Sequence, residues 1–342
     1  MSQPTIKDVS RLAGVSIGTV SNVVNGYPNI SPSTRERVED AIQKLGYTPN
    51  RAAKSLPKGQ TGLLGYRMPY SSRLNSAMDV FLHRVVERAG ALGLEVLLFT
   101  PKSGQSELDA YRDVLKRGGV DGFILAGIEY DDPRVQFLES ANVPFAAFGR
   151  AAPSEKGVAV DIDGAAGTRD AVKHLVSLGR ERIAFVGWPE GSLTGDERFS
   201  GWREGMVAAD LRVMENAVKR AADSYDTGIE LASELVEDGF DSVVCVSDTF
   251  ALGLMAGLVR LGVKPGEDFA VVGFDDIGAA TMIEPGLTSV HQPMGEVGET
   301  LVSRLARILD GQSAPESQVL VAPRLVQRGS SLGSRGPASG QV

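Results

Sequence analysis

Residues 5–25, TIKDVSRLAGVSIGTVSNVVN, predict two short helices joined by a tight turn. Thr5 is placed to cap the first helix, with Asp8 as its reciprocal partner, and Gly14 is a natural stop. Ser16 is placed to cap the second helix, whose outer side carries a slim polar row. Helices this short cannot bury enough surface to be stable alone. They therefore need a further partner along the chain.

That partner is a third helix, predicted to begin at Ser31-Pro32 and to turn Val38, Ile42 and Leu45 inward. Three helices around a small apolar centre form a helix-turn-helix unit, whose second helix reads the DNA major groove. The alternative is a three-helix bundle that only packs. The polar outer row favours the DNA-binding interpretation, because a generic bundle does not need it.

Charge is divided unevenly along the chain. Residues 1–60 carry eight Lys or Arg and four Asp or Glu, a net of +4. The overall net charge is −8, so the remainder carries −12. A small basic end on a large acidic body is expected when only one end of a protein meets phosphates.

Three consecutive segments, 5–26, 31–38 and 41–56, resemble the amino-terminal signature of the LacI/GalR family of bacterial transcription regulators. The resemblance implies a sequence-specific repressor that binds palindromic double-stranded operator DNA as a homodimer and is released by a small effector. It also implies that Ile17, Gly18 and Asn22 point into the major groove. Asn22 suits adenine and Ile17 suits a thymine methyl group, whereas Gly18 offers no side chain for reading.

Further DNA contacts follow from the same resemblance. Hydroxyl and amide side chains near the second and third helices would hold phosphates and set the register without choosing sequence; they are Ser16, Thr19, Ser21, Asn25, Ser31 and Thr34. The remaining positions expected at the DNA are Thr5, Tyr47, Asn50, Ala53, Lys54 and Leu56.

Residues 48–60 read as a hinge segment. Pro49 and Pro57 bracket a stretch of good helix formers that is too short to stay helical in water alone. In the family the matching stretch folds on operator DNA and presses a leucine into the minor groove, and Leu56 matches that leucine. Lys54 stands where many members have arginine. An apolar wedge flanked by basic residues kinks DNA; the alternative is a flexible tether.

From residue 61 onward, buried apolar runs alternate with amphipathic segments, which predicts doubly wound parallel sheets. Expected strands include 121–127 and 269–276, and expected helices include 77–93 and 163–179. The two successive α/β units resemble the two-lobed periplasmic-binding-protein type I fold.

That resemblance sets the expected domain boundaries. They are a helix-turn-helix domain at 1–47, the hinge at 48–60, an effector and dimerisation domain at 61–330, and a disordered tail at 331–342. Lobe 1 would hold about 61–161 and 292–322, and lobe 2 about 162–290 and 323–330. The Gly/Ser/Pro-rich tail lacks leucine heptads, so a dimer is expected rather than a tetramer.

Composition excludes other classes of protein. A hydrophobic content of 42% with 23% charged residues is ordinary for a globular protein, and no apolar run approaches a membrane span or an export signal. A cytoplasmic location is therefore expected. Cys245, the single cysteine, reads as a buried small hydrophobe. No nucleophile-base pair, metal-ligand spacing, phosphate loop or dinucleotide glycine motif appears, so neither an enzyme nor a cofactor is expected.

Candidate effector residues come from strand ends and from the resemblance. Arg150, Asp248 and Asp275 follow predicted strands, where ligands of open α/β folds bind. By resemblance Arg198 matches the effector-contacting arginine of the family, with Trp202 one turn further along. Carboxylates, a guanidinium and an aromatic face suit a sugar. The alternatives are that Asp248 only caps the following helix and that Arg198 only closes an internal ion pair.

Two departures from the family leave the ligand open: Ser247 replaces a common asparagine, and Gly149 stands where several sugar-binding members have aspartate. A nucleobase or a sugar phosphate therefore remains an alternative effector, and a cytoplasmic sugar-binding protein an alternative function. The sequence does not distinguish induction from corepression.

Overall fold

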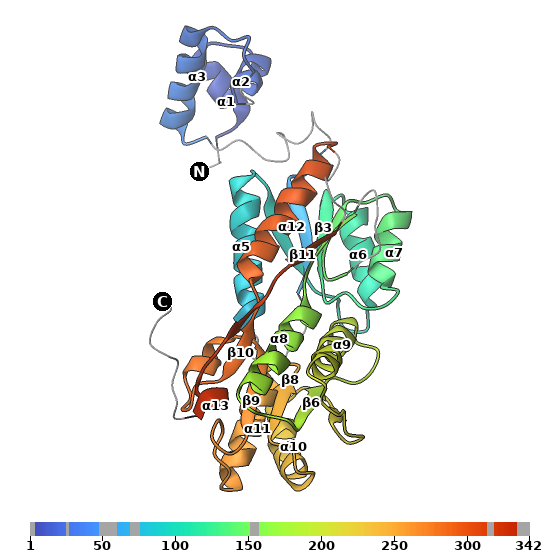
Figure 1. Ribbon diagram of the computed structural model, residues 1–342. Coiled ribbons are helices and arrows are strands. Elements are labelled where there is room, and N and C mark those ends of the chain that lie inside the picture. Colours follow the sequence, from blue (N-terminus) through green and yellow to red (C-terminus); the bar gives the residue numbers. More distant parts are fainter. Residues whose placement is uncertain are drawn as a thin grey trace. The chain divides into compact units, whose positions relative to one another are not determined.

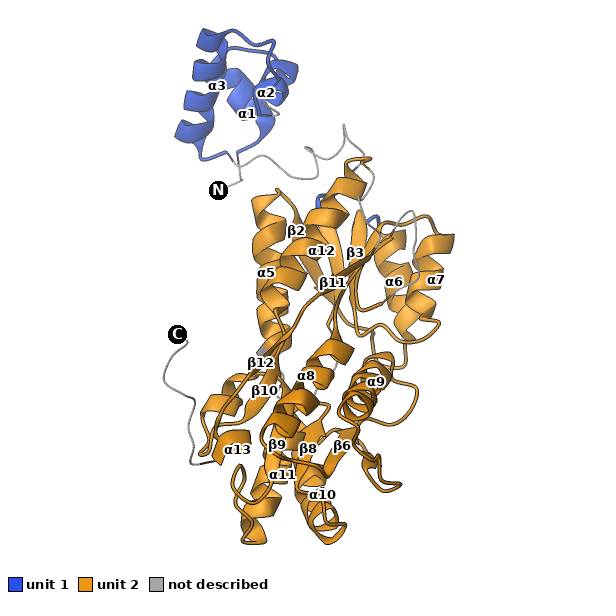
Figure 2. Ribbon diagram, in the orientation of Figure 1, with its two compact units in different colours: residues 1–62, 118–120 blue, residues 63–117, 121–342 orange. Residues whose placement is uncertain are grey.

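The computed structural model describes residues 4–24, 27–47, 60–68, 76–150, 157–312 and 318–333. Contacts between residues divide the chain into two units (Figure 2). The smaller unit holds Met1–Gly62 and Gly118–Val120, and the larger holds Leu63–Arg117 and Asp121–Val342. We call residues 4–47 the headpiece.

The headpiece contains the three expected helices, α1 (Ile6–Ala13), α2 (Ile17–Val24) and α3 (Pro32–Leu45). The side chain of Asp8 accepts hydrogen bonds from the backbone N–H (2.9 Å) and the hydroxyl (2.7 Å) of Thr5, which fixes the start of α1. Ser16 and Ser31 accept the backbone N–H of the residue three positions on and so cap α2 and α3. Gly14 and Gly46 end α1 and α3 in the left-handed conformation.

A small apolar core holds these helices together. Val9, Val20 and Val38, one from each helix, are fully buried. Because no helix of this length is stable alone, their shared core makes the headpiece one folding unit. The expected helix-turn-helix arrangement is therefore present.

The larger unit is built on two six-stranded sheets (Figure 1). Along the first sheet the order is β11 (Gln318–Val321), β5 (Gly157–Ile162), β4 (Phe145–Phe148), β3 (Gly122–Ala126), β1 (Leu63–Arg67) and β2 (Glu95–Phe99). Along the second it is β12 (Arg324–Val326), β10 (Thr288–His291), β9 (Ala270–Asp275), β8 (Ser242–Cys245), β6 (Ile183–Gly187) and β7 (Val218–Arg220). All neighbours are parallel except β10 and β12. The doubly wound α/β class is confirmed.

Helices cover both sheets. The first sheet with its helices forms lobe 1, which includes α5 (Ser76–Ala91), α6 (Glu107–Lys116), α7 (Pro133–Ser140) and α12 (Met294–Leu309). The second forms lobe 2, which includes α8 (Gly164–Ser177), α9 (Leu193–Ala208), α10 (Tyr225–Glu237), α11 (Asp248–Arg260), the short 3₁₀ helix η1 (Gly278–Thr281) and α13 (Gly329–Leu332). In lobe 2, α8 packs on α9 and α10 packs on α11.

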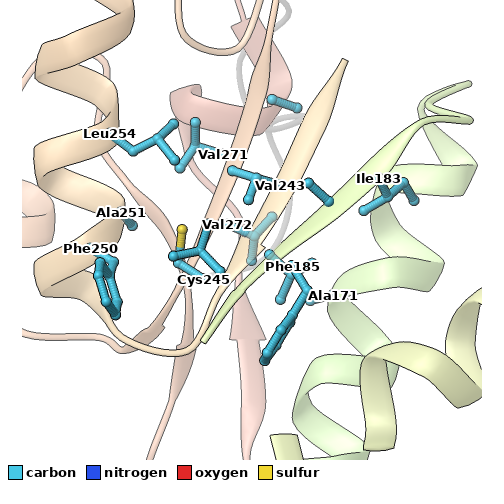
Figure 3. Close-up of a cluster of buried hydrophobic side chains, with 14 of the residues drawn as sticks. Ala171, Ile183, Phe185, Val243, Cys245, Phe250, Ala251, Leu254, Val271 and Val272 are labelled. Carbon is cyan, nitrogen blue, oxygen red and sulfur yellow. The ribbon is translucent and has the colours of Figure 1, made fainter. Parts of the chain in front are cut away.

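The core of lobe 2 is formed around strands whose residues are almost all apolar. Strands β6, β8 and β9 are buried along their whole length, as expected for parallel strands covered on both faces. Cys245 lies among these side chains and is fully buried (Figure 3). Burial raises the pKa of its thiol, so it behaves as the predicted small hydrophobe.

The chain passes between the lobes three times. It leaves the first sheet after β5, returns after β10 to form α12, and leaves again between β11 and β12. Each passage is only one or two residues long between the named elements, and hinges between rigid lobes are formed by a few such residues at the ends of elements.

The carboxyl-terminal region differs from the expected tail at its start. Residues 329–332 form α13, in which Ser330 and Ser331 are buried. The Ser331 hydroxyl lies 2.8 Å from Nε2 of His174 and 2.7 Å from the hydroxyl of Thr288. These long-range hydrogen bonds order a Gly/Ser-rich segment that composition alone assigns to disorder. Residues 334–342 lie outside the described residues.

No helix in the described parts of the chain is both long and apolar enough to span a membrane.

Candidate functional site

The outer side of α2 is the candidate DNA-reading face. Ile17 is 44% exposed, and Asn22 is exposed one turn further along. A Cβ added at Gly18 would meet only the hydroxyl of Ser16, at 3.7 Å. A glycine with this much room around it is not required for packing. The face therefore offers one amide, one apolar side chain and a gap between them.

Hydroxyl groups gather at the amino ends of α2 and α3. The Oγ atoms of Ser16 and Ser31 each lie 2.9 Å from a second hydroxyl, those of Thr19 and Thr34 respectively. Helix amino ends present free backbone N–H groups and a positive dipole, which attract phosphates. This arrangement suits the phosphate-holding role expected for these four residues.

The other expected DNA contacts differ in exposure and in whether they lie among the described residues. Tyr47 is 9% exposed and packs in the headpiece core, so its expected DNA contact stays a prediction. Thr5 is exposed, but its hydroxyl already donates to Asp8. Five further expected contacts lie outside the described residues: Asn25, Asn50, Ala53, Lys54 and Leu56.

Arg198 on α9 is the centre of the candidate effector site. Its side chain is buried, and its Nη1 donates to the carbonyl of Val246 at 2.6 Å. The guanidinium carbon lies 3.6 Å from the ring centre of Phe274 and 5.5 Å from that of Trp188. The buried Nε–H of Arg198 has no hydrogen-bond partner among the described residues. A buried donor of this kind requires an explanation, and a bound ligand is one.

Asp275 at the end of β9 is the acidic partner of Arg198. Its Oδ1 lies 3.6 Å from Nη1 of Arg198 and accepts a hydrogen bond from Nε2 of Gln292. Burial raises the pKa of Asp275 to about 6, although Arg198 opposes the shift. The internal ion pair considered for Arg198 is therefore present, but it uses only part of the guanidinium fork.

Asp275 and Asp276 both have positive φ, 115° and 52°, which non-glycine residues rarely adopt. Asp276 accepts a hydrogen bond from Arg328 at 2.7 Å and lies 2.9 Å from Nδ1 of His291. The two adjacent carboxylates thus have separate partners. Strained backbone that persists beside a buried arginine is typical of functional sites.

Asp248 occupies a different place from the expected one. It is fully buried, and its two oxygens accept hydrogen bonds from the hydroxyl of Ser289 (2.6 Å) and the backbone N–H of Ile277 (2.9 Å). Both oxygens therefore serve the structure of lobe 2 rather than a ligand. The helix cap is Ser247, whose Oγ accepts the N–H of Phe250 at 3.3 Å. Both interpretations of Asp248 from the sequence, as an effector contact and as a helix cap, are therefore corrected.

The prediction that Trp202 contacts the effector is also corrected. It is fully buried in the lobe 2 core, with its ring 5.7 Å from Phe185 and 5.9 Å from Phe199. A buried indole cannot cover a sugar ring. Of the two aromatic side chains beside Arg198, Phe274 is fully buried, and Trp188, which follows β6, is partly exposed.

Arg150 joins the two lobes. Its Nε lies 2.8 Å from Oε1 of Glu197 on α9 and 3.6 Å from Oδ2 of Asp161 on β5. Burial, together with the charge of Asp161, raises the pKa of Glu197 to about 7, while Arg150 opposes the shift. Burial also raises the pKa of Asp161. We call Arg150, Asp161, Glu197, Arg198 and Asp275 the interlobe cluster.

Three members of this cluster are expected from the sequence, Arg150 and Asp275 from strand ends and Arg198 from the resemblance. Asp161 lies one residue before the end of β5 and Trp188 directly follows β6, so the strand-end rule also reaches these two residues once the strands are placed. Glu197 and Gln292 occupy no position that a motif or a period singles out. They are found only from the folded arrangement.

Comparisons with known proteins agree with this architecture. Residues 5–50 match the family of bacterial regulatory proteins described as the lacI family, and residues 172–331 match the periplasmic binding protein-like domain. The transcriptional regulator CelR of Thermobifida fusca is 35% identical over 333 residues, which cover 95% of this chain and 98% of that protein.

Solved structures give the same result. A complex of the regulator CelR with cellobiose is 33% identical, covers 96% of this chain and 99% of that one, and has a TM-score of 0.72. A lac repressor dimer bound to operator and the anti-inducer ONPF is 29% identical, covers 97% of this chain and 100% of that one, and has a TM-score of 0.83.

Proposed function

The chain belongs to the LacI family of DNA-binding transcription regulators, and we propose that it is a homodimeric repressor released from its operator by a neutral sugar. The relatives reported above are transcription regulators rather than enzymes. The open questions for this chain are therefore which ligand it senses and which of its residues carry the response.

The observation that carries the proposal is the interlobe cluster. Two guanidinium groups and three carboxyl groups meet there, and Arg198 keeps a buried donor without a partner among the described residues. Carboxyl groups accept hydrogen bonds from neighbouring hydroxyls, and a guanidinium donates a planar fork. With a pKa of about 6, Asp275 also gains a donor where it is protonated. A polyhydroxylated ligand uses both kinds of partner.

The balance of charge favours a neutral ligand over a phosphorylated one. Arg150 is paired with Glu197 and Asp161, Arg198 is paired with Asp275, and Asp223 and Asp248 also lie close enough to act on the charge of Arg198. Neither arginine therefore offers a phosphate an uncompensated positive charge. Among neutral ligands, the CelR complex makes cellobiose the first candidate for this chain.

The proposed response links this site to DNA binding. An effector that binds one arrangement of the lobes more tightly than the other shifts the population of the dimer. In the proposed mechanism this shift separates the two hinge segments of the dimer. The two headpieces then no longer bind the operator together, so the affinity for the operator falls. Each headpiece alone still binds DNA phosphates weakly.

Ligand screening tests the effector class directly. We expect cellobiose or a related neutral sugar to raise the melting temperature of the full-length chain, because a ligand that binds only the folded state stabilises it. Glucose 6-phosphate and nucleobases at the same concentration are expected to give no shift. Stabilisation by the phosphate or the bases alone would contradict the sugar assignment.

Base reading by the headpiece is tested at Asn22. We expect Asn22→Ala to relax the preference at one symmetric base pair by about 1–3 kcal/mol, because an asparagine pairs bidentately with adenine. Binding sites selected from a random DNA pool by the parent and the mutant measure the effect. Thr34→Ala is the control, since loss of a phosphate contact weakens all sequences alike. Identical site preferences in parent and Asn22→Ala would contradict the assignment.

A further inference from the structure

Lobe 1 holds the first two turns of α9 at two points. Oε2 of Glu129, which follows β3, accepts the backbone N–H of Leu193 at 2.8 Å. Arg150, which follows β4, pairs with Glu197 one turn further along α9. The same helix belongs to lobe 2 and carries Arg198, the residue after Glu197 (Figure 1). The position of Arg198 is therefore tied to lobe 1 by contacts immediately beside it.

The ion pair between Arg150 and Glu197 also separates two like charges. Asp161 of lobe 1 and Glu197 of lobe 2 are each about 15% exposed, and both lie near Nε of Arg150. Without the guanidinium, the pKa of Glu197 would rise further above about 7, so the two poorly solvated carboxyl groups would not both stay ionised across the lobes. Removal of Arg150 therefore costs the ion pair and leaves the carboxyl groups either in repulsion or joined by an added proton.

We propose that Arg150 and Glu197 are positioning residues of the effector site, whose ion pair holds the lobes together before the effector arrives and so keeps Arg198 in place. The inference rests on the proposed function, because it assigns these residues a part in binding the sugar. A protein whose binding-competent arrangement is only partly populated binds its ligand more weakly in proportion. The ion pair raises that population without touching the ligand.

Three variants test the proposal: Arg150→Gln, Glu197→Gln and the double variant. We expect Arg150→Gln to weaken sugar binding by about tenfold in calorimetry, since it removes the ion pair that holds the lobes together. The double variant is expected to bind no more weakly than Arg150→Gln, because the ion pair is already absent from that variant. Such non-additivity is the signature of a direct interaction. Weaker binding by the double variant than by Arg150→Gln would instead make Glu197 a ligand contact and overturn the proposal.

A matched control lies within lobe 2. Nη1 of Arg169 on α8 lies 2.6 Å from Oε2 of Glu204 on α9, and both side chains are about half exposed. This pair shares a helix with Glu197 but does not join the lobes. Arg169→Gln and Glu204→Gln are expected to leave sugar affinity unchanged. An equal loss in this control would mean that any ion pair on α9 has the same effect, which would overturn the assignment.

A second readout needs no ligand. Spin labels at Glu139→Cys on α7 and Val207→Cys on α9 report the distance between the lobes, and buried Cys245 is protected from labelling. We expect Arg150→Gln to lengthen and broaden the distance distribution of the ligand-free chain, and Arg169→Gln to leave it unchanged. An unaltered distribution in Arg150→Gln overturns the proposal. If no sugar binds the parent, the proposed function fails, while this distance still decides whether the ion pair holds the lobes.

Discussion

Arg198→Ala is expected to abolish the response to effector while leaving operator binding in place. The guanidinium is buried between the Val246 carbonyl, Asp275 and two aromatic rings, so no neighbouring side chain replaces it. Each lost hydrogen bond to a charged group costs about 1.5–3 kcal/mol, so loss of two weakens ligand binding by roughly two to four orders of magnitude. Calorimetry with the sugar and fluorescence anisotropy with operator DNA measure the two properties separately.

Two further variants, together with a measurement of stability, distinguish loss of the effector site from loss of the fold. Arg198→Lys keeps the charge but not the planar fork and is expected to retain only weak binding. Asp275→Asn is expected to abolish the response as well, because it removes the carboxylate that faces the guanidinium. Thermal unfolding shows whether lobe 2 remains folded in each variant. Release of operator DNA by folded Arg198→Ala and Asp275→Asn at the parent's sugar concentration would place the effector site elsewhere.

Gly201→Ala is expected to be among the most damaging single substitutions in lobe 2. A Cβ at this position would lie 2.0 Å from the carbonyl oxygen of Ala165 and 2.4 Å from the hydroxyl of Thr168. The Thr168 hydroxyl donates to the carbonyl of Arg198 at 2.7 Å, so α8 and α9 are in close backbone contact here. Overpacking of this kind costs about 1–3 kcal/mol and sometimes more, because backbone rather than a flexible side chain must move.

Chemical denaturation measures this loss of stability. The matched control is Gly90→Ala, an exposed helical position with nothing within 4 Å of an added Cβ. That substitution is expected to stabilise the chain by about 0.4–1 kcal/mol, since alanine lowers the entropy of the unfolded state. Equal unfolding midpoints for Gly201→Ala and the parent would contradict the close contact between α8 and α9. Gly201→Ala is also expected to weaken sugar binding, because the displaced helix carries Arg198.

Local rules account for the headpiece and for most of the sheets. The caps at Thr5, Ser16 and Ser31 and the stops at Gly14 and Gly46 are determined by residues within four positions, and all five appear in the structure. Long apolar strands are similarly local. Such features can be read from the sequence because their partners are close in the chain.

The candidate site cannot be predicted in the same way, because its residues contact partners that are distant in the sequence. Trp202 lies one turn from Arg198 and shares its side of the helix, as expected, but that side faces the interior. Helical spacing shows which residues share a face and does not show what the face meets. Asp248 follows a strand as the rule requires, yet both its oxygens bond residues about 30 to 40 positions away. The pairing of Arg150 with Glu197 across the lobes is equally nonlocal.

The most direct test of the account follows the protein and its DNA together. The full-length chain is used to select duplex DNA from a random pool, and anisotropy of the selected duplex is recorded while neutral sugars are added. We expect a palindromic site, released by one of the sugars from the parent and retained by Arg198→Ala. A selected site that no neutral sugar releases from the parent, or one that the sugar releases equally from Arg198→Ala, would contradict the account.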